Sequence, residues 1–169
     1  TEANKGNKGI STFVVETKSP GFNVVSKLKK MGYRGSQTAE LFFENLKVHK
    51  DNMIGPEGGG HITVMNGLDF ERAMIAPICL GISERALEIS VEYAKIREQF
   101  GKPISNFQMI QSKIADMYTW VESIRSLVYC VLSQCDSIDK SQAGKGEIHM
   151  NTSASVTFAS TTSNKILDE

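Results

Sequence analysis

The spacing of apolar residues changes at segment 55–60, where the sequence reads Gly-Pro-Glu-Gly-Gly-Gly. Before this segment, short apolar runs alternate with turn residues, a pattern typical of strands. After it, apolar residues recur every three or four positions, which predicts helices. The chain is therefore expected to be an α+β protein. An antiparallel β domain at 1–55 precedes an antiparallel helical bundle at 56–169, with segment 55–60 as a flexible hinge.

The β domain is expected to be incomplete. Strands are predicted at 11–16, 22–28 and 38–48, separated by turn sequences at 19–21 and 32–35. Three strands cannot bury both faces of a sheet by themselves. These strands are therefore expected to be part of a larger barrel or sandwich.

A first long helix is predicted after residue 60, because an apolar stripe continues to position 100. Pro77 lies inside this stripe and is expected to kink the helix or to mark the join of two segments, since proline has no backbone N–H. Gly101 is expected to cap the helix in a left-handed conformation, and Pro103 to prevent its continuation. The residues of the stripe are Ile75, Ile78, Ile82, Ala86, Ile89, Tyr93, Ile96 and Phe100.

A second helix has an unbroken three-and-four spacing, typical of the seam of a helical bundle. Ser105 and Gln108 are expected to form its capping box, and the short connection predicts that it packs antiparallel to the first helix. A weaker third helix is predicted from Glu147 to the end, where many small Ser, Thr and Ala residues suit close packing. The seam residues are Phe107, Ile110, Ile114, Met117, Val121, Ile124, Val128 and Val131.

The composition is that of a globular protein without a strong charge bias. Nineteen basic residues balance 19 acidic ones, and no apolar run is long enough to span a bilayer, so neither a nucleic-acid partner nor a membrane span is predicted. The three cysteines lack the spacing of a zinc or redox pair, and the three histidines are scattered, so no metal site is predicted. Cys79 and Cys130 are expected to be reduced and buried.

The charged residues Asp69, Glu71 and Arg72 fall together within a mostly apolar run. One interpretation is a solvated notch near a helix start, where acidic groups suit the helix dipole. The other is a partly desolvated carboxylate held beside an arginine that orients it, as a general base requires. Both interpretations are open from the residues alone.

Two motifs lie in register on the first predicted helix and just after it. Segment 67–72 reads Gly-Leu-Asp-Phe-Glu-Arg, and segment 97–103 reads Arg-Glu-Gln-Phe-Gly-Lys-Pro. The first resembles the start of the C-terminal helical domain of acyl-CoA dehydrogenases, and the second is similar to the Arg-x-x-Phe-Gly signature of that family. Their order and separation make a chance match improbable. Further segments that match the family are 32–36, 41–48, 107–108 and 115–117.

The resemblance implies a catalytic base. In this family the catalytic glutamate lies either near the C-terminus or, in isovaleryl-CoA dehydrogenases and some long-chain enzymes, on this early helix. Glu71 matches the early position, so the resemblance favours the isovaleryl branch. It implies that Glu71 removes the α-proton of an acyl-CoA thioester while FAD accepts hydride from the β-carbon, giving a 2-enoyl-CoA. The residues implied to contact the acyl-CoA are Asp69, Phe70, Arg72, Asn7 and Lys8.

The resemblance also implies an FAD site at Arg97, Phe100 and Gln108. A guanidinium suits a pyrophosphate, because it presents a fork of N–H donors. Each polar residue has a structural alternative. Arg97 could neutralise a helix C-terminus, and Gln108 could complete the capping box.

The partners implied by the resemblance are an acyl-CoA substrate, an electron-transfer flavoprotein and further copies of the chain in a homotetramer. The chain is expected to be an internal piece of such an enzyme, in the mitochondrial matrix of a eukaryote or otherwise in the cytoplasm. Two alternatives stay open. One is a dehydrogenase or oxidase for another acyl chain, and the other is that the isolated chain is a non-catalytic helical assembly module that binds little or no FAD.

Overall fold

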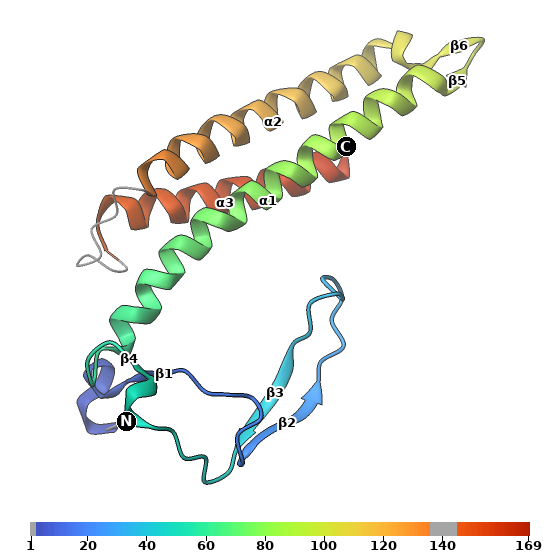
Figure 1. Ribbon diagram of the computed structural model, residues 1–169. Helices are drawn as coiled ribbons and strands as arrows, with labels where there is room; N and C mark the ends of the chain where they lie inside the picture. Colours follow the sequence, from blue (N-terminus) through green and yellow to red (C-terminus); the bar gives the residue numbers. More distant parts are fainter. Residues whose placement is uncertain (1–2, 136–144) are drawn as a thin grey trace. The chain divides into compact units, whose positions relative to one another are not determined.

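The computed structural model describes residues 3–135 and 145–169. Two compact units divide between Thr63 and Val64. Among the described residues, the first unit holds short strands and three-ten turns, and the second holds the long helices (Figure 1). This order confirms the predicted α+β class.

The longest strands form one antiparallel hairpin. Strand β2 (Phe22–Lys27) pairs with β3 (Ala39–Phe43), and the register shifts between Val24 and Ser26. The third predicted strand was expected to reach residue 48, but β3 ends earlier. Asn45 has a φ of 50°, which is incompatible with an extended strand.

The remaining strands of the first unit pair with each other. Strand β1 (Thr12–Phe13) is antiparallel to β4 (Met53–Ile54), a strand that the sequence pattern did not predict. Two three-ten turns, η1 (Ala3–Gly9) and η2 (Lys50–Asn52), flank these strands in the sequence. The described part of the unit therefore contains separate two-stranded sheets instead of one three-stranded sheet.

Both faces of the β2–β3 hairpin are open. Adjacent residues of a strand point to opposite faces, and Val24 and Val25 are 54% and 61% exposed. Leu41 and Phe42 on the partner strand are exposed as well. The hairpin therefore buries neither face against the described residues of the chain.

The glycine-rich segment is tied to the strand before it. The N–H of Gly58 donates to Oγ of Ser11 (2.9 Å), and the N–H of Gly60 donates to the carbonyl of Ile10 (2.8 Å). A Cβ on Gly60 would lie 2.9 Å from both the Ile10 carbonyl and Oγ1 of Thr12. These glycines therefore permit a close backbone approach to the strand before them, and the flexible hinge stays a prediction.

The described helices are α1 (Gly60–Ile96), α2 (Gln108–Cys135) and α3 (Gly146–Asp168). Figure 1 shows α1 and α2 running antiparallel, as predicted. Helix α1 continues through Pro77 as one helix, so the alternative of two joined segments is excluded.

The connection between α1 and α2 is a hairpin. Strands β5 (Glu98–Gln99) and β6 (Lys102–Pro103) pair around Phe100 and Gly101, whose φ angles are 53° and 76°. Two positive φ values at the central positions are typical of a type I′ turn. Gly101 is left-handed as predicted, but it belongs to this turn and does not cap α1, which ends at Ile96.

The start of α2 differs from the predicted capping box. Ser105 lies in the three-ten turn η3 (Ile104–Asn106), and the carbonyl of Phe107 accepts the first helical hydrogen bonds. The side chain of Gln111 reaches back to the Ser105 carbonyl (2.9 Å), whereas Gln108 is exposed. The predicted capping box was wrong. The three-ten turn η3 places the start of α2 two residues later than it would be if Ser105 were its N-cap.

One apolar core joins the described helices. The predicted seam of α2 is buried from Met117 onward, which confirms the three-and-four pattern. Helix α1 contributes Ala76 and Leu80, and α3 contributes Ala159 and Ile166. The buried α2 residues of the seam are Met117, Val121, Ile124, Val128 and Val131.

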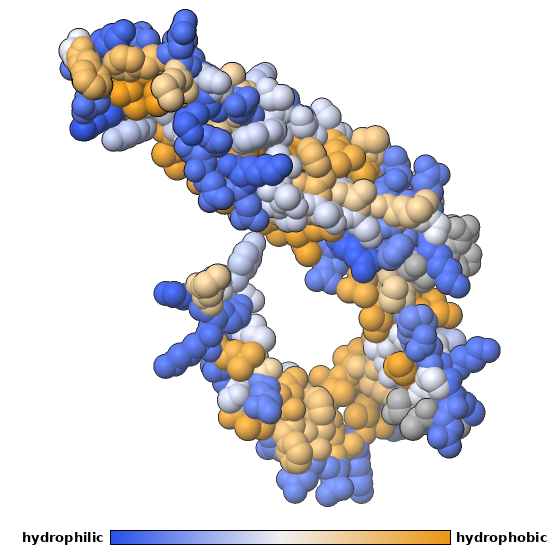
Figure 2. Space-filling model, turned by 180° about the vertical axis from the view of Figure 1, so that it is seen from behind, coloured by the Kyte–Doolittle hydropathy of each residue, from blue (hydrophilic) through white to orange (hydrophobic). Residues whose placement is uncertain are grey.

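The apolar stripe predicted on α1 is not the face of the helix that the structure buries. Its large residues, such as Ile78 and Tyr93, are exposed, and hydrophobic residues lie open along the bundle surface in Figure 2. The buried positions are mostly small, including Ala73, Ala76 and Ser83. Helix α1 carries apolar residues on more than one face, and small side chains let a neighbouring helix approach closely.

Helix α3 is held by small and polar residues, as its composition predicted. Thr152 and Ser155 are fully buried. Oγ of Ser163 donates to the carbonyl of Cys79 on α1 (3.4 Å), and Nδ2 of Asn151 donates to Oε1 of Gln134 on α2 (2.8 Å). These contacts tie α3 to both other helices.

The cysteines are free, as expected, but they are not all buried. Cys79 and Cys135 are half-buried and Cys130 is exposed. The burial predicted for Cys130 was wrong, because its apolar neighbour Val131 occupies the buried seam position instead.

Candidate functional site

Asp69, Arg72 and His149 meet where the first turns of α3 pack against α1, and we call them the Asp69 cluster. Oδ1 of Asp69 lies 2.6 Å from Nδ1 of His149 and 3.3 Å from Nη1 of Arg72. Asp69 is only 3% exposed, whereas the side chains of Arg72 and His149 are 30% and 27% exposed. The buried carboxylate is thus compensated from its own helix and from α3.

The donors of the Asp69 cluster follow from simple chemistry. Nη1 of Arg72 also lies 3.3 Å from Nδ1 of His149. A guanidinium only donates, and a ring nitrogen that carries a proton cannot accept. A carboxylate oxygen only accepts, and it lies 2.6 Å from Nδ1 of His149, so we assign the proton to Nδ1. Nδ1–H of His149 and the N–H of Arg72 then both donate to Oδ1 of Asp69.

Glu71 lies on the opposite side of α1. Residues two apart on a helix are separated by about 200° around its axis, so Glu71 points away from Asp69 and is exposed. One turn earlier, a Cβ on Gly67 would meet no described atom within 4 Å. One turn later, Met74 and Ile75 are 60% and 37% exposed. The carboxylate therefore lies in open space beside apolar side chains.

Of the charged residues that the sequence grouped together, the desolvated one is therefore Asp69. The arginine beside it binds Asp69 and not Glu71. Phe70, between them in the sequence, is 43% exposed. The desolvated carboxylate held beside an arginine is thus that of Asp69, whereas the carboxylate of Glu71 is accessible.

The three residues matched to an FAD site lie at the turn between α1 and α2. Arg97 directly follows α1, Phe100 occupies the tip of the β5–β6 hairpin and Gln108 opens α2. All three are exposed, and Phe100 is 92% exposed. The ring of Phe100 contacts Phe107 edge-on at 6.1 Å between centroids.

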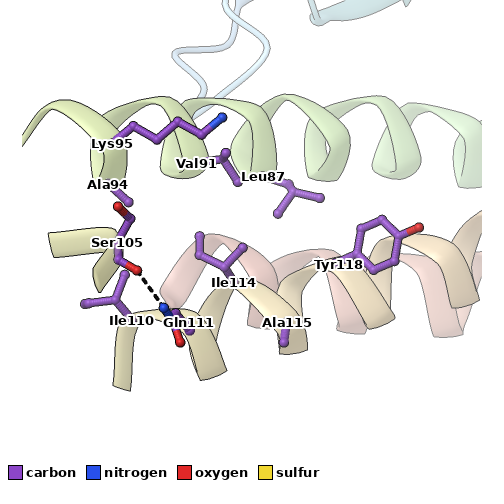
Figure 3. A pocket seen from close by; sticks show the side chains of 10 residues that line it. All are labelled: Leu87, Val91, Ala94, Lys95, Ser105, Ile110, Gln111, Ile114, Ala115 and Tyr118. Carbon is purple, nitrogen blue, oxygen red and sulfur yellow. Dashed lines mark hydrogen bonds between the residues drawn. The ribbon is translucent and has the colours of Figure 1, made fainter. Parts of the chain in front are cut away.

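An apolar pocket of about 400 Å³ lies between α1 and α2, next to this turn. Leu87 and Val91 line it from α1, and Ile114 and Tyr118 line it from α2 (Figure 3). The residues that line this pocket include none of the Asp69 cluster.

The family profile described as "Acyl-CoA dehydrogenase, C-terminal domain" matches residues 58–167, which is most of the chain. The chain belongs to the acyl-CoA dehydrogenase family. The match begins at the glycine-rich segment and includes the Asp69 cluster, Glu71 and the turn between α1 and α2.

Relatives of this acyl-CoA dehydrogenase chain include several branched-chain enzymes. It is 47% identical over 137 residues to the mitochondrial 2-methylacyl-CoA dehydrogenase of Solanum tuberosum, covering 81% of this chain and 33% of the relative. It is also 47% identical to the mitochondrial isovaleryl-CoA dehydrogenase of Oryza sativa subsp. japonica, covering 81% and 34%. The chain thus spans about a third of the relatives it matches.

Solved structures agree with the family assignment. Butyryl-CoA dehydrogenase from Megasphaera elsdenii superposes with a TM-score of 0.87 at 40% identity, covering 98% of this chain and 42% of that chain. A chain in the structure of the electron transferring flavoprotein of Acidaminococcus fermentans has a TM-score of 0.88 at 39% identity, with the same coverage. Both structures thus support the α+β class and the family assignment of this acyl-CoA dehydrogenase chain.

The exposed turn of this acyl-CoA dehydrogenase chain suits the cofactor of its family, FAD. The guanidinium of Arg97 is available for an anionic group such as a pyrophosphate. The amide of Gln108 is likewise exposed, and the contact to Ser105 is made by Gln111 instead. The structure therefore does not support the alternative in which Gln108 completes a capping box with Ser105.

The other predicted acyl-CoA contacts lie elsewhere. Asn7 and Lys8 are exposed in η1 and belong to the first unit, whereas Glu71 belongs to the second. Within the second unit, the structure brings Asp69 and Arg72 together.

Sequence reasoning missed His149. It is 80 positions from Asp69, so no local spacing could have joined the two residues. The residues described form no group of three or more His, Cys, Asp or Glu suited to a metal ion. In the same part of the chain, no helix has the length and apolar character needed to cross a membrane.

Proposed function

We propose that this chain carries the catalytic base of an FAD-dependent acyl-CoA dehydrogenase, and that this base is Glu71. The carboxylate of Glu71 is exposed on α1, whereas Asp69 is buried and bound to Arg72. A base must reach the α-carbon of a bound thioester, so the accessible carboxylate suits this role better than the buried one. The observation that carries the proposal is that Glu71 is exposed on the side of α1 opposite to the buried Asp69.

The reaction breaks the α C–H bond of the acyl thioester and transfers its proton to the carboxylate of Glu71. Bound FAD supplies the acceptor for the hydride that leaves the β-carbon, so that a 2-enoyl-CoA results. Met74 and Ile75 lie open one turn beyond Glu71. An acyl chain packed on these side chains would exclude water from Glu71 and strengthen it as a base.

The proposed substrate is isovaleryl-CoA or another short branched acyl-CoA. The names of the plant relatives support a branched chain, and an isovaleryl-CoA dehydrogenase of Oryza sativa is among them. Phe70, Arg72, Asn7 and Lys8 are proposed to contact the acyl-CoA, and Arg97, Phe100 and Gln108 the FAD. A dehydrogenase or oxidase for another acyl chain remains the alternative, since a short-chain enzyme of Megasphaera elsdenii is 48% identical over 129 residues.

We further propose a homotetramer that transfers electrons to an electron-transfer flavoprotein. The mitochondrial names of the plant relatives support the mitochondrial matrix in a eukaryote, and a bacterial protein would act in the cytoplasm. Because the chain spans a third of these relatives, the isolated chain is proposed to bind little or no FAD. The alternative for the isolated chain is a non-catalytic helical assembly module. A stoichiometric yellow complex formed by the isolated chain would contradict this.

The decisive experiment uses a full-length enzyme that contains this chain. Glu71→Gln should abolish exchange of the substrate α-proton with D2O while FAD binding is retained, because the amide cannot accept the proton. Glu92→Gln, an exposed position on the same helix, is the matched control and should exchange normally. Full exchange by Glu71→Gln would assign the base to another residue. Comparing which acyl-CoA bleaches the flavin then tests the substrate class.

A further inference from the structure

Asp69 is the charged residue that the structure buries most deeply, at 3% exposure. An isolated buried carboxylate is strongly unfavourable, so its partners determine whether this turn of α1 is stable. Arg72 comes from the same helix and would accompany Asp69 in any movement of α1. His149 comes from α3, and its 2.6 Å contact is the shorter of the two. His149 therefore connects this turn to a separate helix.

His149 is itself held in place. It lies in the first turn of α3, and Oγ1 of Thr152 donates to its carbonyl (3.2 Å). Thr152 is fully buried. Asn151 lies two positions after His149, and its Nδ2 donates to Oε1 of Gln134 on α2 (2.8 Å). The imidazole is thus presented to α1 by a helix end that is anchored on α2.

The contact controls the rotation of α1 about its axis. Asp69 and Glu71 point about 200° apart around the same helical turn. A bond that fixes the direction of Asp69 therefore fixes the direction of Glu71 as well. The buried residues of α1 nearest to Asp69, Ala73 and Ala76, have small side chains, and the first large buried residue, Leu80, lies about three turns further along.

We propose that His149 is a positioning residue for Glu71: its Nδ1–H donates to Asp69 and thereby holds the turn of α1 that presents the Glu71 carboxylate. This role rests on the proposed function of Glu71. Proton abstraction requires close approach and alignment of the base with the α C–H bond, and a displacement of about 1 Å can slow such a step about 100-fold. His149 does not touch the reacting atoms.

The test compares His149→Ala with His149→Asn in the full-length enzyme. The asparagine amide places an N–H donor close to the position of Nδ1, whereas alanine removes the donor. His149→Ala should lower kcat and the α-proton exchange rate about 10- to 100-fold with little change in KM. His149→Asn should recover most of this loss. Met150→Ala, at an exposed position next to His149, should behave as wild type.

The hydrogen bond has a readout that does not depend on activity. In ¹⁵N–¹H spectra, the Nδ1–H signal of His149 should lie downfield in the wild type and move upfield in Asp69→Asn. The inference is overturned if His149→Ala retains wild-type kcat, if His149→Asn is as slow as His149→Ala, or if the signal is insensitive to Asp69. A wild-type enzyme that exchanges no α-proton, or full exchange by Glu71→Gln, instead overturns the proposed function and with it this role.

Discussion

Oδ1 of Asp69 lies 2.6 Å from Nδ1 of His149, which is 80 positions further along the chain. This one hydrogen bond joins the motif-bearing turn of α1 to the start of α3. Because Asp69 is buried and is also bound to Arg72, the contact affects both the stability of the bundle and the direction of neighbouring side chains.

Removal of the Asp69 carboxylate should destabilise the bundle. Asp69→Ala leaves the N–H groups of Arg72 and His149 without their shared acceptor, and the free energy of unfolding should fall by about 1–3 kcal/mol. Urea denaturation followed by circular dichroism measures this change. Asp116→Ala, at an exposed position on α2, is the control and should change it by less than about 0.5 kcal/mol. Equal midpoints for the two variants would show that the buried carboxylate contributes nothing.

Two glycines at different points of α1 should respond in opposite directions to alanine. A Cβ on Gly60 would lie 2.9 Å from the Ile10 carbonyl, so Gly60→Ala should destabilise the fold by about 1–3 kcal/mol. A Cβ on Gly81 would meet no described atom within 4 Å, so Gly81→Ala should stabilise the helix by about 0.5–1 kcal/mol. Thermal unfolding of both variants checks the signs. An unchanged or higher Tm for Gly60→Ala would contradict the close approach of Gly60 to Ile10, and a lower Tm for Gly81→Ala would contradict the open space at Gly81.

The cysteines should differ in their reactivity. Cys130 is exposed and should be alkylated first by iodoacetamide. Burial raises the pKa of the Cys79 thiol, and a backbone hydrogen bond opposes this only in part. A raised pKa leaves less thiolate at a given pH, so modification of Cys79 should begin only at higher pH than for an ordinary thiol. Mass spectrometry of peptides labelled between pH 7 and 10, with the unfolded chain as control, measures the order. Modification of Cys79 before Cys130 would refute it.

Replacement of Arg97 should weaken FAD binding in a full-length enzyme. Arg97→Met removes a charge-assisted hydrogen bond to an anionic group, which is worth about 1.5–3 kcal/mol, so the Kd for FAD should rise about 10- to 100-fold. Arg85→Met is the matched control, because Arg85 is an exposed arginine of α1 that pairs with Glu88. Flavin fluorescence during dilution measures the affinity. An unchanged Kd would favour the alternative in which Arg97 only neutralises the end of α1.

Periodic features were predictable from the sequence. Val121, Ile124 and Val128 recur every three or four positions along α2, so the sequence indicates that they share one face of the helix. Helix α1 was different because apolar residues occupy several of its faces. Its large residues Ile78 and Ile82 dominated the pattern, although Ala76 and Leu80 are the residues of α1 that pack in the core.

The sequence by itself determined the α+β order, the seam of α2 and the motifs that place Glu71 and Arg97 in the acyl-CoA dehydrogenase family. Those properties depend on neighbours within a few positions. Only the tertiary structure decided that β1 pairs with β4, that Gly60 is packed against Ile10 and that His149 binds Asp69. Such pairings join distant segments, and their energy arises from contacts that exist only after the helices and strands have assembled.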